Sequence, residues 1–183
     1  MSSLVQPAPG RLELVRALVN TRDLDLGTDV LVDAADLRRW ARAHRFDADE
    51  ASDPDVQRVR ALREALRAGL AANHEGAALP RDAAATIDGC ARWAGAGVTF
   101  ADGPGWSIVS ASAGVRGMLA GLLDIVAHSM SDGSWRRLKT CHNDSCQWAF
   151  YDGSRTQTAK WCSMRICGNR LKQSAWRARA ASR

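Results

Sequence analysis

The chain has 183 residues, of which 46% are hydrophobic and 25% are charged, which is the composition of an ordinary globular protein. This length allows one domain of average size with a small module beside it. No apolar run approaches the roughly 20 residues of a membrane span, and the first ten residues lack the basic region and apolar core of a signal peptide. We therefore expect a cytoplasmic protein with no membrane partner and with reduced thiols.

Apolar residues recur at helical spacing in four segments, which we predict to be helices: 11–20, 33–44, 53–70 and 82–94. Asp33 and Asp53 are the expected N-caps of the second and third helices, and Pro54 fits the first turn of the third. The pattern then becomes an alternation around Asp102-Gly103-Pro104-Gly105, which predicts a β-hairpin over residues 97–110. A wide apolar stripe over residues 112–130 predicts a further helix.

Charge is distributed unevenly along the chain. Residues 135–183 contain eleven Lys or Arg against two Asp, whereas the first 134 residues carry a net negative charge. Such an asymmetry indicates two parts with different partners. We expect a helical body over residues 1–134 and a basic module over residues 135–183.

Four cysteines in two equal pairs mark the basic module. Fifteen residues separate the pair Cys141-x4-Cys146 from the pair Cys162-x4-Cys167. Two thiolate pairs on tight turns supply the four ligands of a tetrahedral structural Zn²⁺, and a module this small needs such a staple. The alternatives are two disulfides, four unrelated buried thiols, or His142 in place of one cysteine. A catalytic zinc is disfavoured because such a site keeps an open position.

The surroundings of the cysteines fit a closed site. Gly168 lets the backbone turn sharply beside the metal, and four aromatic residues between the pairs are expected to cover it: Trp148, Phe150, Tyr151 and Trp161. Cys90 lies alone on a predicted helix and is expected in the core. The predicted fold class is α+β: a mainly helical body with a small β-hairpin, followed by a C-terminal four-cysteine zinc module and a basic helix.

The cysteine-containing segment resembles the CGNR zinc finger, named for the tetrapeptide found here at residues 167–170. The resemblance covers about thirty residues and includes both pairs, Trp148, Phe150-Tyr151-Asp152, Ser154-Arg155 and 161–164. One departure is Gln147, where members often have Gly, which leaves the ligands intact but alters the first turn.

A weaker resemblance covers the body. Residues 16–23 (RALVNTRD) and the pattern Asp36-Leu-x-x-Trp40 are similar to the ABATE domain, which usually precedes this finger. Together the two resemblances imply a bacterial, stress-responsive transcription regulator. They also imply that the finger binds DNA and that the body senses a small-molecule effector.

The basic end fits a nucleic-acid partner. Residues 164–180 predict a helix with a break near Gly168-Asn169. Lys and Arg neutralise phosphates, while Arg, Asn and Gln can read base edges in the major groove. The candidate DNA contacts are Arg155, Arg165, Asn169, Arg170, Lys172, Gln173, Arg177 and Arg179. Alternatively, Asn169 is a turn residue, Arg155 holds its loop through backbone carbonyls, and the helix is a solvated surface or binds RNA or an acidic protein.

The first 134 residues contain no glycine-rich phosphate loop, nucleophile elbow or metalloprotease motif, so we expect no enzyme. A polar corner at the end of the first helix is the candidate wall of an effector pocket, although helix capping also explains it: Asn20, Thr21, Arg22 and the nearby Trp40.

The expected function is a zinc-dependent, DNA-binding transcriptional regulator, forming a homodimer if its target is palindromic. The alternative is a ligand- or protein-binding module whose zinc ribbon stabilises a partner-binding surface.

Overall fold

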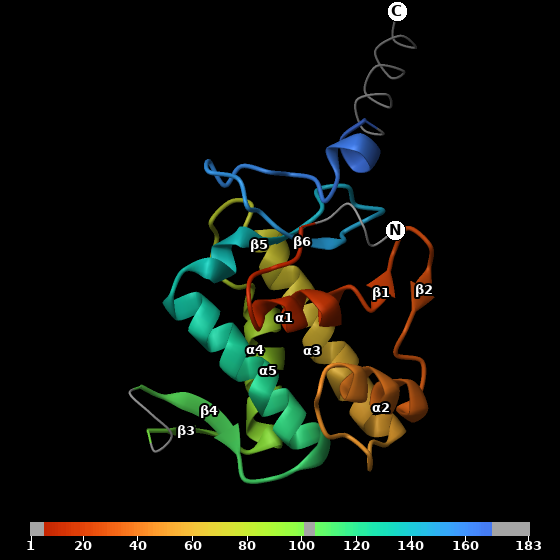
Figure 1. Ribbon diagram of the computed structural model, residues 1–183, viewed down its shortest axis with the longest axis vertical. Coiled ribbons are helices and arrows are strands. Elements are labelled where there is room, and N and C mark those ends of the chain that lie inside the picture. Colours follow the sequence, from red (N-terminus) through yellow and green to blue (C-terminus); the bar gives the residue numbers. More distant parts are fainter. Residues whose placement is uncertain (1–5, 101–104, 170–183) are drawn as a thin grey trace, which may run out of the picture.

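The computed structural model describes residues 6–100 and 105–169, and it has an α+β fold built mainly of helices (Figure 1). The α-helices of this part of the chain are α1 (Leu12–Val19), α2 (Ala34–Ala43), α3 (Asp53–Ala72), α4 (Arg81–Ala94) and α5 (Gly114–Ser131). The strands form antiparallel two-stranded ribbons: β1 (Arg22–Asp23) with β2 (Thr28–Asp29), β3 (Ala96–Thr99) with β4 (Ser107–Ser110), and β5 (Leu138–Thr140) with β6 (Ala149–Tyr151).

The five helices predicted between residues 11 and 130 and the predicted hairpin lie where the sequence places them. The predicted N-cap of α3, Asp53, was wrong by one residue, because Ser52 occupies the N-cap position. The Ser52 N–H and hydroxyl both donate to the Asp55 carboxylate, at 3.0 and 2.6 Å. Asp53 instead accepts from the N–H of Ala34 (3.2 Å), which ties the start of α2 to the start of α3.

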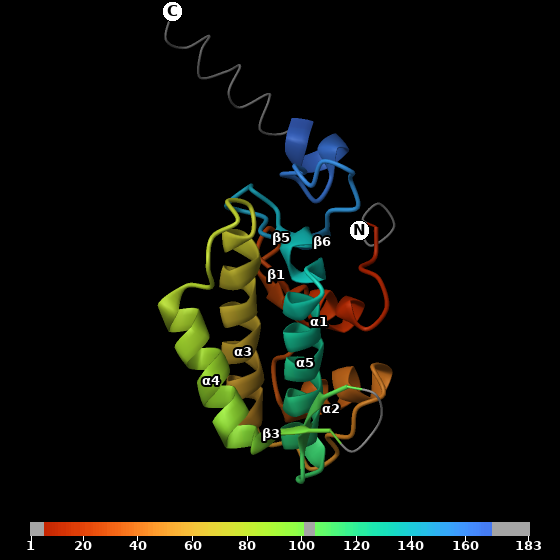
Figure 2. The ribbon, with the colours of Figure 1, turned by 90° about the vertical axis from the view of Figure 1, so that its left-hand side faces the viewer.

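The core lies between α1, α3, α4 and α5. Figure 2 shows α3, α4 and α5 running alternately up and down, while α1 crosses near their upper end. Helix α4 ends at Gly95, whose φ of 62° lies in the left-handed region that glycine adopts without strain. The core side chains that are shielded most completely include Val15, Leu18, Leu37, Leu62, Leu66, Leu70, Met118, Leu119 and Leu122. Each contributes about 1.5–3 kcal/mol relative to an exposed position.

The cysteine-containing segment lies at the upper end of the body in Figure 1, opposite the β3–β4 ribbon. A 3₁₀ turn, Ser134–Arg137, leads from α5 into β5. Leu138 and Ala149 of the β5–β6 ribbon belong to the same hydrophobic cluster as the helices. Of the predicted helix over residues 164–180, the structure describes a π-helical turn, Met164–Gly168, and Asn169; the remainder lies outside the described residues. Within the described ranges, no helix combines the length and apolarity required to cross a bilayer.

Candidate metal centre

The first cysteine pair lies in the turn between β5 and β6. The N–H of Cys141 donates to the carbonyl of Trp148 (2.9 Å), which closes the base of the turn. At its tip, the N–H groups of Cys146 and Gln147 both donate to the carbonyl of Asn143, at 2.8 and 3.0 Å. Gln147 has a φ of 43°, in the left-handed region that glycine tolerates best. A glycine at this position would therefore relieve strain.

The second cysteine pair flanks the π-helical turn, Met164–Gly168. The carbonyl of Ser163 accepts from the N–H of Cys167 (2.9 Å), which tightens the turn between the two sulfurs. The two pairs are joined through the backbone, because the N–H of His142 donates to the carbonyl of Lys160 (2.9 Å). Both pairs are thereby fixed relative to each other.

Gly168 packs closely against two side chains of the second turn. A Cβ at this position would lie 2.9 Å from Met164 Sδ and 3.3 Å from Trp161 Cδ1. Its φ is not positive, so the absence of a side chain serves close packing rather than the sharp turn expected from the sequence.

The Sγ atoms of the four cysteines converge on one point. All lie within 4.8 Å of one another, and Cys162 Sγ is 3.8 Å from the Sγ atoms of both Cys146 and Cys167. A tetrahedral Zn²⁺ with Zn–S bonds of about 2.3 Å holds its sulfurs about 3.8 Å apart. The geometry and the donor set therefore form a Zn²⁺ site with the predicted ligands: Cys141, Cys146, Cys162 and Cys167.

The crowding of the thiols shows why the cluster takes a dication. Hydrogen bonds from Cys146 and Cys162 stabilise the Cys141 thiolate and lower the pKa of Cys141. The same contacts with Cys141 raise the pKa of Cys146 and of Cys162. The hydrogen bonds that stabilise the Cys141 thiolate thus hold the protons on Cys146 and Cys162. Zn²⁺ would be bound by deprotonated sulfurs, so its binding would displace the protons that Cys146 and Cys162 hold.

Apolar side chains shield the cluster. Trp148, Trp161 and Ile166 pack against the cysteines. Two of the aromatic residues expected to cover the metal lie elsewhere, because Tyr151 packs against the core of the body and Phe150 lies beside His74. The aromatic shielding therefore comes from the two tryptophans.

His142 lies outside the sulfur cluster, although it is inside the first pair. Its ring meets the rings of His74 and Trp161 edge-on, with centroids 5.3 and 5.7 Å apart. His74 Nε2 lies 2.6 Å from the carbonyl oxygen of Thr140 in β5. The two histidines thus connect the end of α3 to the cysteine-containing segment.

Two asparagines of the body bind the backbone of this segment. Asn20 donates to the carbonyl of Ala149 (2.9 Å) and accepts from its N–H (2.7 Å), across 129 positions of sequence. The amide of Asn73 donates to the carbonyls of Trp135 and Leu138, both at 2.8 Å. Local sequence patterns carry no signal for such contacts, and the sequence indicated for Asn20 a helix cap or a wall of an effector pocket.

Two family profiles match the chain. The profile of the CGNR zinc finger matches residues 137–180, which contain all four ligands, and the profile of ABATE, described as a putative stress-induced transcription regulator, matches residues 12–132. The chain belongs to the ABATE family. Its zinc site lies in a CGNR zinc finger that follows the ABATE domain. No curated protein matches the chain.

The structure places three candidate DNA contacts of the CGNR finger, and all three are exposed. Arg155 lies in the loop between the cysteine pairs, and Arg165 lies in the π-helical turn. Asn169 directly follows this turn and donates from Nδ2 to the carbonyl of Arg165 (3.3 Å). The other candidates lie outside the described residues: Arg170, Lys172, Gln173, Arg177 and Arg179.

The loop that carries Arg155 is held by other residues of the finger. Arg137 Nη1 donates to the carbonyls of Asp152 and Ser154, at 3.1 and 3.2 Å. Lys139 Nζ forms a buried ion pair with Asp152 (2.9 Å). The sequence suggested such hydrogen bonds to the loop carbonyls for Arg155, but in the structure Arg137 donates them.

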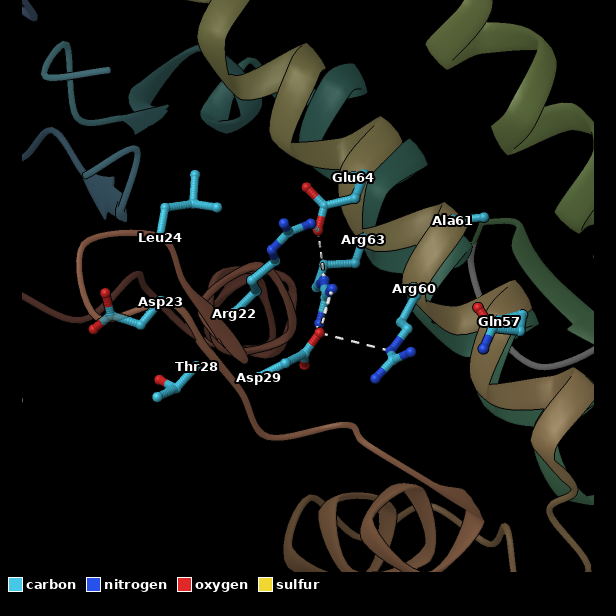
Figure 3. A pocket seen from close by; sticks show the side chains of 11 residues that line it. Arg22, Asp23, Leu24, Thr28, Asp29, Gln57, Arg60, Ala61, Arg63 and Glu64 are labelled. Atoms are coloured by element: carbon cyan, nitrogen blue, oxygen red, sulfur yellow. Dashed lines mark hydrogen bonds and ion pairs between the residues drawn. The ribbon is translucent and has the colours of Figure 1, made fainter. Parts of the chain in front are cut away.

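Four residues were expected to form the wall of an effector pocket, and one of them, Arg22, lines the pocket beside the β1–β2 ribbon. This open pocket of about 590 Å³ lies between the β1–β2 ribbon and α3 of the ABATE domain (Figure 3). Asn20 is used to bind the finger, and the hydroxyl of Thr21 donates to the carbonyl three residues earlier (2.7 Å). Trp40 is buried and stacks on Phe46, away from this pocket.

Proposed function

We propose that this ABATE-family protein is a zinc-dependent transcription regulator that binds DNA through its CGNR finger. The supporting observation is the exposed turn between two zinc ligands, Cys162 and Cys167. This turn carries Arg165, is followed by Asn169, and leads directly into residues 170–183, which contain five Lys or Arg and no acidic residue.

In this proposal the zinc has a structural role. Four sulfur ligands leave no open position for water or substrate, so the metal fixes the start of the basic segment. Arginines and lysines then neutralise phosphates, which provides affinity without sequence information. Asn169 and Gln173 are the proposed readers of base edges, together with Arg170.

The same proposal assigns the ABATE domain a regulatory role, exerted through its contacts with the finger. A cytoplasmic location fits this role, and a homodimer would match a palindromic target. A small-molecule effector would act through the ABATE domain.

The test is fluorescence anisotropy of labelled duplex DNA with the zinc-loaded chain at increasing salt. We expect binding that weakens steeply, with a logarithmic slope of about 0.9 for each phosphate neutralised. Arg165→Gln should weaken binding and reduce the slope by about one phosphate. The control is Arg42→Gln, which changes an exposed arginine of α2 and should leave both quantities unchanged.

Two outcomes would count against DNA binding. One is the absence of any affinity at low salt, and the other is an equal effect of Arg165→Gln and Arg42→Gln. Either would favour the alternative in which the zinc finger stabilises a protein- or ligand-binding surface.

A further inference from the structure

The pocket beside the β1–β2 ribbon brings arginines and carboxylates together from β1, β2 and α3. Four guanidinium groups meet two carboxylates at this place: Arg22, Arg60, Arg63 and Arg67 with Asp29 and Glu64 (Figure 3 draws all but Arg67). Asp23 also lines the pocket, but its carboxylate accepts from the N–H of Leu26 in its own turn (3.0 Å). Three arginines and three carboxylates thus line the pocket itself, and Arg67 adds a fourth guanidinium that bonds to Glu64 from outside the lining.

The two buried arginines, Arg63 and Arg67, donate hydrogen bonds to the carboxylates. Arg63 donates from both terminal nitrogens to Asp29, at 2.7 and 2.8 Å, and from Nε to Glu64, at 2.8 Å. The second oxygen of Glu64 accepts from Arg67 Nε at 3.0 Å. Each oxygen of both carboxylates therefore already accepts from a buried arginine.

Arg22 and Arg60 are the arginines with unused donors. Arg22 Nη1 lies 3.7 Å from Glu64, and Arg60 Nε lies 3.6 Å from Asp29, both beyond hydrogen-bond distance. Arg60 Nε is buried and has no hydrogen-bond partner among the described residues. In Figure 3, Arg22 from β1 and Arg60 from α3 lie on either side of the Asp29–Arg63 pair. Guanidinium groups match the oxygens of carboxylates and phosphates, and about 590 Å³ suits a small ligand.

Arg67 connects this pocket to the zinc site. Its Nη2 donates to the carbonyls of Val19 (2.7 Å) and Arg22 (3.3 Å), and its Nη1 donates to the carbonyl of Gln147 (2.9 Å). Gln147 directly follows the zinc ligand Cys146 and has the left-handed backbone described above. One buried guanidinium therefore bonds to the backbone of a pocket residue and to the first cysteine turn.

We propose that the pocket binds a small molecule bearing a carboxylate or phosphate group through Arg22 and Arg60, and that Arg67 transmits its occupancy to the zinc site through Gln147. The ligand draws Arg22 away from Glu64 and shifts the carbonyl to which Arg67 donates. The regulatory purpose rests on the proposed function, but the binding and its effect on the zinc site are both measured without DNA.

The binding is tested by calorimetric titration of the zinc-loaded full chain with inorganic phosphate and with succinate, against sodium chloride at equal ionic strength. We expect saturable binding of at least one anion. Arg22→Gln and Arg60→Gln should each weaken it about tenfold, the order expected for a lost hydrogen bond to a charged group. Arg42→Gln is the matched control and should bind as the unchanged chain does. The proposal is overturned if neither anion binds, or if the pocket variants bind like the control.

The transmission is tested by amide hydrogen exchange on the unchanged chain with and without the anion that binds. We expect altered protection around residues 145–149, and unaltered protection in the β3–β4 ribbon. Arg67→Lys keeps the charge but cannot bridge the same three carbonyls, so it should bind the anion and lose the altered protection. If the anion binds but exchange at residues 145–149 is unaltered, the proposed transmission to the zinc site is overturned. The unchanged chain alone gives this result, so the test holds even if Arg67→Lys fails to fold.

Discussion

Asp152 organises the loop between the two cysteine pairs. Its buried carboxylate accepts from Lys139 Nζ (2.9 Å), from the Ser154 hydroxyl (2.6 Å) and from the N–H of Ala159 (2.9 Å). Burial raises the pKa of Asp152, but the hydrogen bonds from Ser154 and Lys139 outweigh it, so the pKa lies below the ordinary value. The carboxylate is therefore charged at neutral pH and balances the equally buried ammonium of Lys139.

Removing that balance should be costly. Asp152→Asn leaves the buried charge of Lys139 uncompensated, and we expect a loss of about 3–5 kcal/mol in the free energy of unfolding, measured by urea denaturation. Asp49→Asn is the control, because it breaks an exposed pair with Arg42 that is worth at most about 1 kcal/mol. Equal losses for the two variants would contradict the role given to Asp152.

The ion pair of Asp29 with the buried Arg63 should make the stability of the fold depend on pH. Burial of Asp29 raises its pKa, but hydrogen bonds from Arg63 and from the N–H of Leu31, together with the charges of Arg63 and Arg60, lower it, and the net pKa lies below the ordinary 3.8. A carboxyl with a lowered folded pKa stabilises the fold above its unfolded pKa, and this stabilisation is lost as the pH falls through the folded value. We therefore expect the free energy of unfolding to fall more steeply below about pH 4 in the unchanged chain than in Asp29→Asn. Parallel pH profiles of the two chains would refute this.

At the scale of the elements, the β5–β6 ribbon belongs to both parts of the molecule. Its turn supplies Cys141 and Cys146, while Leu138 and Ala149 are buried with the helices of the body. The second cysteine pair has no such ribbon. Cys162 and Cys167 pack only in the small cluster that all four cysteines form with Trp148, Trp161 and Ile166. The metal should therefore stabilise these segments to different degrees.

Cys162→Ser should release the zinc and expose residues 160–169 to rapid amide exchange. Protection of the β5–β6 strands should persist, because their side chains remain buried against α1 and α3. We therefore expect residues 160–169 to depend on zinc more than the β5–β6 ribbon does. The matched control is Cys90→Ser, which changes a buried cysteine of α4 outside the cluster and should keep one zinc per chain. Full protection at residues 160–169 in Cys162→Ser would contradict the prediction.

The sequence predicted the longer elements because their patterns are local. Helices α3 and α5 repeat apolar residues over several turns, and the zinc ligands form two short, regular pairs. The β1–β2 and β5–β6 ribbons have strands of two or three residues, too short to show an alternation, and tertiary contacts hold them. The pocket escaped prediction for a related reason, since Arg22 and Arg60 come together only after folding. The sequence placed Trp40 beside the polar residues at the end of α1. In the structure, Trp40 lies on the buried face of α2 and packs in the core.

At the scale of the whole molecule, the ABATE domain and the finger share one hydrophobic core. Trp135, Leu138 and Ala149 pack in the same cluster as the helices. Asn73 adds two buried hydrogen bonds across the junction, to the carbonyls of Trp135 and Leu138. The zinc-loaded chain should therefore unfold as one cooperative unit.

Calorimetry of the zinc-loaded chain should show a single transition. Asn73→Ala removes the side-chain donor of two buried carbonyls. The carbonyl of Trp135 keeps its bond from the N–H of Leu138, whereas the carbonyl of Leu138 loses the Asn73 donor at a cost of about 1–3 kcal/mol. The Tm of the whole transition should therefore fall by about 2–4 °C per kcal/mol. Asn169→Ala serves as the control, because it changes an exposed asparagine and should leave the Tm unchanged. Two resolved transitions would contradict a shared core.

The contact between Asn20 and Ala149 also bears on the tendency of the protein to aggregate. A strand edge with free N–H and C=O groups is a template for aggregation by strand addition. Strand β6 pairs with β5 on one side, and on the other the side-chain amide of Asn20 donates to and accepts from Ala149 as a neighbouring strand would. A single asparagine at the end of α1 thus blocks this edge against intermolecular pairing.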